Sequence, residues 1–191
     1  MTMFRRIFII GFLSFTGFLV LFSTGIYPSV FRAHNGNGSK IRTYIMLKDL
    51  TLGIKNYEVE YGHLPIFPGQ ASEGPVSLSA GSPLLKILLG ENEQGLNPHK
   101  VTFIEPPMGR DGALGLIGTP GRYSLMDAWG TPYEVFMPAE GAHEIPNPDV
   151  RSKEHSISTN APPALVPTVA ARSLGEDKKA DTKDDIVSWR Q

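Results

Sequence analysis

The chain has 191 residues, a formal net charge of −1 and a pI of about 6.5. This length suits one domain with an appendage, and the near-neutral charge argues against nucleic acid as a partner, because it provides no basic field. Cysteine is absent, so disulfides, thiolate metal ligands and a cysteine nucleophile are excluded.

The most apolar segment of the chain begins at Ile7 and ends at Ile26, and it contains no charged residue. A helix needs about 20 such residues to cross a bilayer, whereas the apolar region of a cleaved signal peptide runs to about 7–15 residues. We therefore expect a transmembrane helix in an N-terminal membrane anchor, residues 1–31; cleavage near residues 23–25 is the alternative. The expected localisation is a single-pass inner-membrane protein with residues 32–191 in the periplasm or outside.

A second helix, amphipathic this time, is expected over residues 40–62. The sequence before it, AHNGNGSK, predicts a turn-rich interruption. Gly62 stands where a helix-terminating glycine belongs, and Pro65 prevents continuation. Apolar side chains recur at steps of three and four residues, which is the spacing of one helix face. The members of this face are Tyr44, Leu47, Leu50, Ile54, Tyr57 and Tyr61.

Residues 63–191 are expected to form a small head. A short buried helix is predicted with Ser82 as its N-cap, Pro83 as its first residue and Gly90 as its stop. The predicted fold class is α+β, with a transmembrane helix, an amphipathic helix and a head of about three antiparallel strands. Strands are expected at residues 101–105, on both sides of a turn at residues 130–132, and at residues 168–175.

Enzyme motifs do not emerge from the sequence. The pair His143 and Glu144 is followed by Asn147, where a zinc-protease helix needs its second histidine. There is no G-x-S-x-G elbow and no P-loop, and GALGLIG spaces its glycines by three, unlike a dinucleotide-binding loop. We therefore expect no enzymatic activity, with an anchored hydrolase as the alternative from that class.

Four stretches in order, IKNYEVEYGHLP, LLKILLGENEQGLNP, DAWGTPYEV and SLGEDKKADTKDDIVSW, carry a resemblance to a known family. Together they resemble the G-type (major) pseudopilins of type II secretion. The resemblance implies a pilin-like fold, in which a membrane helix extends into an amphipathic stretch and a three-stranded head ends near a calcium loop. It implies a structural, non-catalytic subunit of a type II secretion or related pilus-like apparatus, in contact with other pseudopilin or secretion-system subunits or with copies of itself.

The N-terminus departs from this family. Prepilins are cut after a glycine that ends a polar leader, and the mature chain has Glu at its fifth position. Cleavage is predicted here after Gly11, but the preceding RRIFII is largely apolar and the fifth residue after the cut is Thr16. Thr16 lacks the carboxylate that the resemblance requires for pairing with a neighbouring subunit. The alternative function is therefore a membrane-anchored extracytoplasmic binding module whose pilin-like head does not polymerise.

The C-terminal acidic stretch is the candidate metal site. Calcium takes 6–8 oxygen ligands, and carboxylates from one loop are suitable donors. The resemblance implies a loop of the form G-x-D-G-x-x-G-T-x-D-D-I. This chain departs from it at two positions, because Lys178 and Asp181 stand where the pattern has glycine. The alternative is an ion-free loop whose acids are balanced by lysines. The predicted calcium ligands are Asp177, Asp181, Asp184 and Asp185, of which Asp181 stands at one glycine position.

In DAWGTPY, turn chemistry is supplied by Gly130 and Pro132. Asp127 is expected to cap this turn and not to act as a catalyst. Trp129 and Tyr133 are expected to bury their rings against the long helix.

Overall fold

The computed structural model describes residues 26–67, 74–139, 141–166 and 168–190. It falls into two compact units, residues 1–39 and 40–191, and each is described by itself. Among the described residues, the first unit contributes the beginning of helix α2 (Ile26–Tyr61). The second unit contains the remainder of α2 and every described strand.

The predicted transmembrane helix is wrong for the part of the chain that the structure describes. No helix there is both long and apolar enough to cross a membrane. The long helix, α2, has 36 residues, but its sequence contains charged residues such as Arg42, Lys48 and Asp49. The predicted single-pass inner-membrane localisation depended on a membrane-spanning helix and is corrected with it. The segment from Ile7 to Ile26 lies outside the described residues except for its last member, and so does Gly11.

α2 begins earlier than the sequence predicts. Residues 33–40, expected to interrupt the chain with turns, are helical. Glycine costs only about 1 kcal/mol in a helix and asparagine less, while extending a helix adds one hydrogen bond for each residue ordered. A helix that is held by packing along one part can therefore continue through such a segment. Local propensity alone is a poor guide to where this helix starts.

The C-terminal end of α2 is confirmed. Gly62 follows the last helical residue with a φ of +74°, and its N–H donates to the carbonyl of Glu58 at 2.8 Å. Glycine reaches this left-handed conformation without a steric penalty, which is why it ends helices so often. The predicted face is buried over most of its length, although Tyr44 is 38% exposed. Its fully buried members are Leu47, Leu50, Ile54 and Tyr57.

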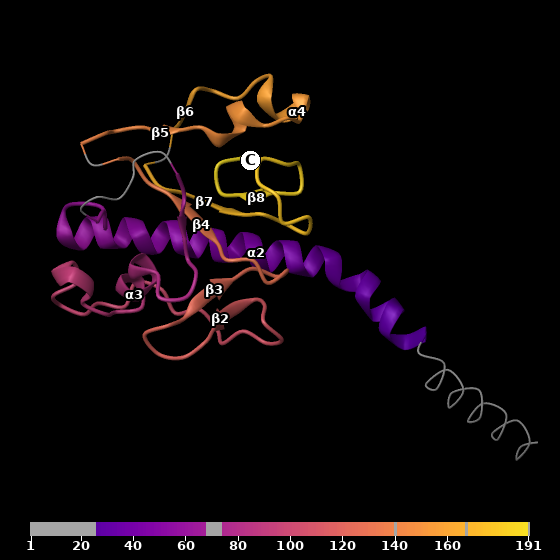
Figure 1. Ribbon diagram of the computed structural model, residues 1–191, viewed down its shortest axis with the longest axis horizontal. Coiled ribbons are helices and arrows are strands. Elements are labelled where there is room, and N and C mark those ends of the chain that lie inside the picture. The colour runs from indigo at the N-terminus through magenta and orange to yellow at the C-terminus, as the bar shows by residue number, and fades with distance from the viewer. Residues whose placement is uncertain (1–25, 68–73, 140, 167, 191) are drawn as a thin grey trace, which may run out of the picture. The chain divides into compact units, whose positions relative to one another are not determined.

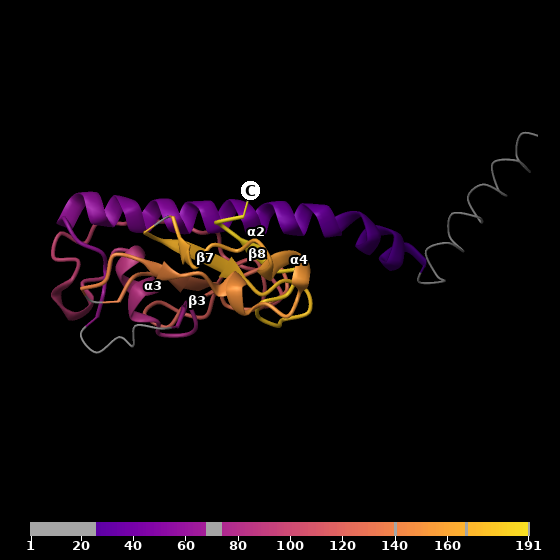
Figure 2. The same ribbon diagram turned by 90° about the horizontal axis from the view of Figure 1, so that it is seen from above.

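The buried face of α2 packs on a four-stranded antiparallel sheet, and Figures 1 and 2 show the sheet beside the helix. The prediction of about three strands is corrected to four. Two of the four strands are only two residues long, too short for alternation of apolar and polar residues to reveal them. In spatial order the strands are β1 (Val76–Ser77), β4 (Glu134–Phe136), β7 (Ala170–Ser173) and β8 (Ile186–Val187).

The remaining described strands form two smaller antiparallel sheets. One joins β2 (Gly115–Ile117) to β3 (Ser124–Met126), and the other joins β5 (Ile145–Pro146) to β6 (Ala164–Leu165). The two strands predicted around the turn at residues 130–132 are present, but they belong to different sheets, because β3 pairs with β2 and β4 with β1 and β7.

Residues 101–105, predicted as a strand, contain none. The N–H groups of Phe103 and Ile104 instead donate to the carbonyl of Leu88, at 2.9 and 3.2 Å. Leu88 ends helix α3 (Pro83–Leu88), so this apolar segment caps a helix where a strand was expected. An extended, apolar run has the same composition in both roles, and the sequence does not distinguish them.

The remaining helices are short. α3 agrees with the prediction: it follows Ser82, starts at Pro83 and precedes Gly90, which has a φ of +94°. The side chain of Ser82 makes no capping hydrogen bond, however, and its hydroxyl is buried without a partner. The others are η1 (Glu93–Gly95), η2 (Pro148–Arg151) and α4 (His155–Ser158).

Candidate functional site

The acidic loop, residues 174–185, connects two neighbouring strands of the main sheet. β7 and β8 are antiparallel partners, with Ser173 opposite Ile186, so the two ends of the loop are held side by side. Val187 is buried, and the ring of Trp189 packs edge-on against Phe136 with centroids 5.5 Å apart. The loop is therefore fixed at both ends on the head, as the apolar residues after the aspartates predict.

The backbone of this loop takes left-handed conformations at two non-glycine residues. Lys178 has a φ of +57° and Asp181 a φ of +66°. At these two positions the resembling pattern has glycine, and its remaining glycine corresponds to Gly175. A left-handed conformation costs a residue with a Cβ roughly 1–2 kcal/mol, so the surrounding contacts must hold the loop in this shape. The chain thus keeps a glycine-type backbone without the glycines.

Hydrogen bonds tie the two sides of the loop together. Asp184 Oδ2 accepts from the N–H of Asp177 at 3.0 Å, and Asp184 Oδ1 accepts from the hydroxyl of Thr182 at 2.6 Å. Burial opposes ionisation of Asp184, but these donors outweigh it and lower the pKa of its carboxyl. Asp177 in turn accepts from the N–H of Lys179 at 2.8 Å. These two carboxylates act as internal turn caps.

The other two aspartates face Arg172, which the sequence analysis did not single out. Nη1 of Arg172 donates to Asp181 Oδ1 at 2.5 Å and lies 3.7 Å from Asp185 Oδ2. Its Nε and Nη2 both donate to Oε2 of Glu134, at 3.0 and 2.7 Å, and Glu134 is its cross-strand partner on β4. Asp185 Oδ2 also accepts from the N–H of Asp181 at 2.9 Å. One guanidinium therefore forms ion pairs with three carboxylates.

Burial affects Asp185 and Arg172 differently: it disfavours the charged form of Asp185, whereas Arg172 stays charged. Desolvation raises the pKa of Asp185 to about 6, against the lowering influence of Arg172 and of the Asp181 N–H. The side chain of Asp185 is only 1% exposed and that of Arg172 only 6%. A buried arginine keeps its charge, so its partners must supply the compensation.

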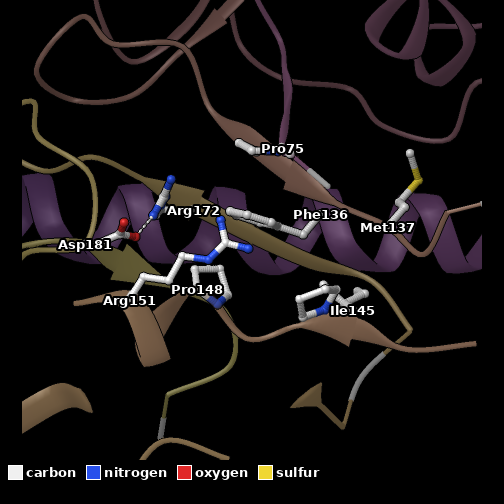
Figure 3. Close-up of a pocket in the computed structure, with 10 residues that line it drawn as sticks. Pro75, Phe136, Met137, Ile145, Pro148, Arg151, Arg172 and Asp181 are labelled. Atoms are coloured by element: carbon white, nitrogen blue, oxygen red, sulfur yellow. Dashed lines mark hydrogen bonds and ion pairs between the residues drawn. The ribbon is translucent and has the colours of Figure 1, made fainter. Parts of the chain in front are cut away.

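Arg172 and Asp181 also line a cavity of about 190 Å³ on the head. Figure 3 shows their ion pair beside Phe136 and Pro148, with Arg151 reaching into the same space. The guanidinium of Arg172 lies 5.2 Å from the centroid of the Phe136 ring, a favourable cation–π distance. The lining combines apolar side chains with the Arg172–Asp181 ion pair and with Arg151, which makes no ion pair within the described residues.

The predicted calcium ligands do not converge on one point. The backbone N–H of Asp177 donates to the carboxylate of Asp184, while Asp181 and Asp185 face Arg172. Among the described residues no group of three or more His, Cys, Asp or Glu side chains is placed to hold a metal ion. The arrangement does not fit the 6–8 oxygen ligands of calcium. Calcium binding by this loop stays a prediction.

Asp127 caps the DAWGTPY turn, as predicted. Its Oδ1 accepts from the N–H groups of Trp129 and Thr131, at 2.9 and 2.8 Å. Its Oδ2 accepts from the hydroxyl of Ser173 at 2.6 Å, and that hydroxyl oxygen accepts from the N–H of Gly175 at 3.2 Å. Asp127 is fully buried. It therefore links the turn to the start of the acidic loop, a contact that the sequence does not reveal.

A second buried carboxylate, Asp149, holds the C-terminal residues. It accepts from Nε1 of Trp189 at 3.0 Å and from Nε of Arg190 at 2.8 Å. Burial opposes ionisation, but the bonds from Arg190 and Trp189 outweigh it and lower the pKa of Asp149. Asp149 could not be singled out from the sequence, because nothing in residues 148–151 shows which distant segment they contact.

The exposed side of α2 carries large apolar side chains. Four of them belong to a single stripe, which we call the outer stripe, and each is more than half exposed. They are Ile41 at 59%, Ile45 at 53%, Leu52 at 57% and Val59 at 85%. The apolar spacing in the sequence predicts the opposite, buried face of this helix and does not single out the outer stripe.

Comparisons with protein-family models, with curated proteins and with solved structures find no match for this chain.

Proposed function

We propose that this protein is a non-catalytic structural subunit, similar to the G-type pseudopilins, that assembles with copies of itself in a type II secretion or related pilus-like apparatus. The observation that carries the proposal is the outer stripe of α2. The order of motifs along the chain supports it, as does the packing of a long helix on an antiparallel sheet that is followed by a pinned acidic loop.

The members of the outer stripe are aligned along the helix, with the exposed Lys48 between Ile45 and Leu52. With about 100° between successive residues, Ile41, Ile45, Leu52 and Val59 fall within roughly 40° of one another around the helix axis. The fully buried Leu50 lies about 140° or more from each of them. Scattered exposed apolar side chains are ordinary, but an aligned row of them marks a surface suited to contact with another protein.

Charges border the outer stripe differently on its two sides. Lys48 and Lys55 lie at one edge, and Asp49 lies at the other beside the uncharged Asn56, all four exposed. When two such helices pack side by side in parallel, the basic edge of one faces the acidic edge of the other. In register, parallel packing therefore joins apolar to apolar residues and places Lys48 of one helix at the level of Asp49 of the other. This complementarity favours a second copy of the chain as the occupant.

Engineered cysteines test the contact directly, because the natural chain has none to interfere. We expect Leu52→Cys to form disulfide-linked dimers under mild oxidation, since a disulfide needs Cα atoms within about 7 Å. Glu60→Cys is the matched control: it is exposed on the same helix but lies about 80° away from Leu52 around the axis. It should not form the disulfide-linked dimer.

The same experiment decides between this proposal and a binding module that does not polymerise. Equal and weak cross-linking at Ile45→Cys, Leu52→Cys, Val59→Cys and Glu60→Cys would contradict assembly through the outer stripe. That outcome would favour the alternative that Thr16 already suggests, in which the carboxylate used for subunit pairing is missing.

A further inference from the structure

We propose that Arg172 is the internal cation of the acidic loop, and that the loop takes its folded shape without calcium. The loop concentrates negative charge that needs a positive partner. Asp181, Asp185 and Glu134 each lie within 3.7 Å of a guanidinium nitrogen of Arg172. Carboxylates gathered at one partly buried place repel one another unless a cation lies between them.

The guanidinium is well suited to this role. It is planar, carries five N–H donors and keeps its charge when buried. Arg172 uses Nε and Nη2 on Glu134 and Nη1 on Asp181, so it joins strand β4, strand β7 and the loop in one network. The register of the sheet places Glu134 directly opposite Arg172, within reach of its guanidinium.

The loop's departures from the resembling pattern fit the same explanation. Asp181 stands where that pattern has glycine, and it is the residue whose carboxylate pairs with Arg172 at 2.5 Å. Its carbonyl also accepts from the hydroxyl of Ser152 at 2.6 Å. An aspartate in a left-handed conformation (φ +66°) is strained, and these contacts offset the strain. The substitution that costs backbone energy is the one that brings a partner to Arg172.

The remaining aspartates are committed to donors within the loop. Asp177 accepts from Lys179 N–H, Asp184 from Thr182 and Asp177 N–H, and Asp185 from Asp181 N–H. A calcium ion would have to draw these oxygens away from their present partners and face the positive charge of Arg172. The carboxylates of the loop are therefore already hydrogen-bonded within the loop or paired with Arg172.

Thermal unfolding of the full chain in chelator and in millimolar calcium tests this inference. The wild type should melt at the same temperature in both. Arg172→Met, which keeps an apolar stem and removes the charge, should melt several degrees lower, and Arg172→Lys should recover part of that loss. Arg151→Met is the matched control, since Arg151 lines the same cavity, is exposed and makes no ion pair within the described chain; it should melt like the wild type.

Two results would overturn the inference. One is a rise of several degrees in the melting temperature of the wild type on adding calcium. The other is an Arg172→Lys variant that is no more stable than Arg172→Met, which would leave Arg172 with a packing role alone.

A second measurement uses only the wild type and so does not depend on a variant folding. Lysyl endopeptidase cleaves after lysine, and Lys178, Lys179 and Lys183 are all exposed in the loop. The rate of cleavage at these sites, followed by mass spectrometry, should be equal in chelator and in calcium. Protection of the loop by calcium would contradict the role given to Arg172.

Discussion

Asp127 shows how much one buried residue can organise. Its two oxygens accept hydrogen bonds from Trp129, Thr131 and Ser173, and no part of it is exposed. The turn half of this arrangement could be predicted, because an aspartate two residues before a tryptophan–glycine turn commonly caps it. The bond to Ser173 could not, since it depends on which strand lies beside the turn, and no local pattern encodes that.

Replacing Asp127 tests its role. Asp127→Ala leaves two backbone N–H groups and the Ser173 hydroxyl without their acceptor, so the free energy of unfolding should fall by roughly 2–4 kcal/mol. Asp127→Asn keeps one carbonyl oxygen for the turn and gains an amide donor for Ser173, and it should lose about 1 kcal/mol. Urea unfolding of both variants measures the difference. Equal losses would show that Asp127 matters for its charge and not for its hydrogen bonds.

Asp149 gives the C-terminus a dependence on pH. Its pKa is lowered from the ordinary 3.8 in the folded state, so its bonds to Trp189 and Arg190 stabilise the fold fully above that value. This contribution is lost as the pH falls below about 3.8 and through the folded-state pKa. In a Trp129→Phe background, the fluorescence of Trp189 should report the loss.

Asp149→Asn is the control for this titration. The variant cannot ionise at that position, so the acid-induced change in Trp189 fluorescence should be absent or much smaller. The same transition in both proteins would assign the pH dependence to another carboxyl group.

At the scale of whole elements, the sequence predicts helix faces, and helix boundaries marked by glycine or proline, better than unmarked boundaries and tertiary partners. The stop of α2 at Gly62 and the start of α3 at Pro83 follow from residue types with strong backbone preferences. The start of α2 does not, because the weak penalties at residues 33–40 are outweighed by helix propagation. The segment 101–105 is misassigned because it packs against the end of α3, a tertiary contact.

Two glycines in α2 offer a matched test of this packing. A Cβ on Gly53 would lie 2.4 Å from Cγ2 of Ile104 and 3.0 Å from the carbonyl oxygen of Phe103, whereas a Cβ on Gly38 would meet nothing within 4 Å. Gly38→Ala should raise stability by up to about 1 kcal/mol through helix propensity. Gly53→Ala should lower it by roughly 1–3 kcal/mol, because the neighbouring segment must move. Thermal melts that show both variants stabilised would contradict the close approach of residues 103–104 to the helix.

At the scale of the whole chain, the described residues assign two faces of α2 to different tasks. One face forms the core with the sheet, and the outer stripe stays exposed. The buried face could be predicted from its apolar spacing. The outer stripe gives a weaker apolar pattern in the sequence, since Lys48 and Lys55 alternate with its apolar members. The order of strands and the Arg172 network could not be predicted, because both depend on contacts between segments far apart in the chain.

The central claim, that the protein assembles through the outer stripe of α2, is tested most directly by sedimentation velocity over a range of protein concentrations. The wild type should sediment as species larger than a monomer, in proportions that rise with concentration. Leu52→Glu, which places a charge in the stripe, should shift the chain toward monomer. Glu60→Lys, which changes a charge on the same helix about 80° from Leu52 around the axis, should behave like the wild type. A wild type that stays monomeric throughout, or a Leu52→Glu variant that associates as strongly as the wild type, would contradict the claim.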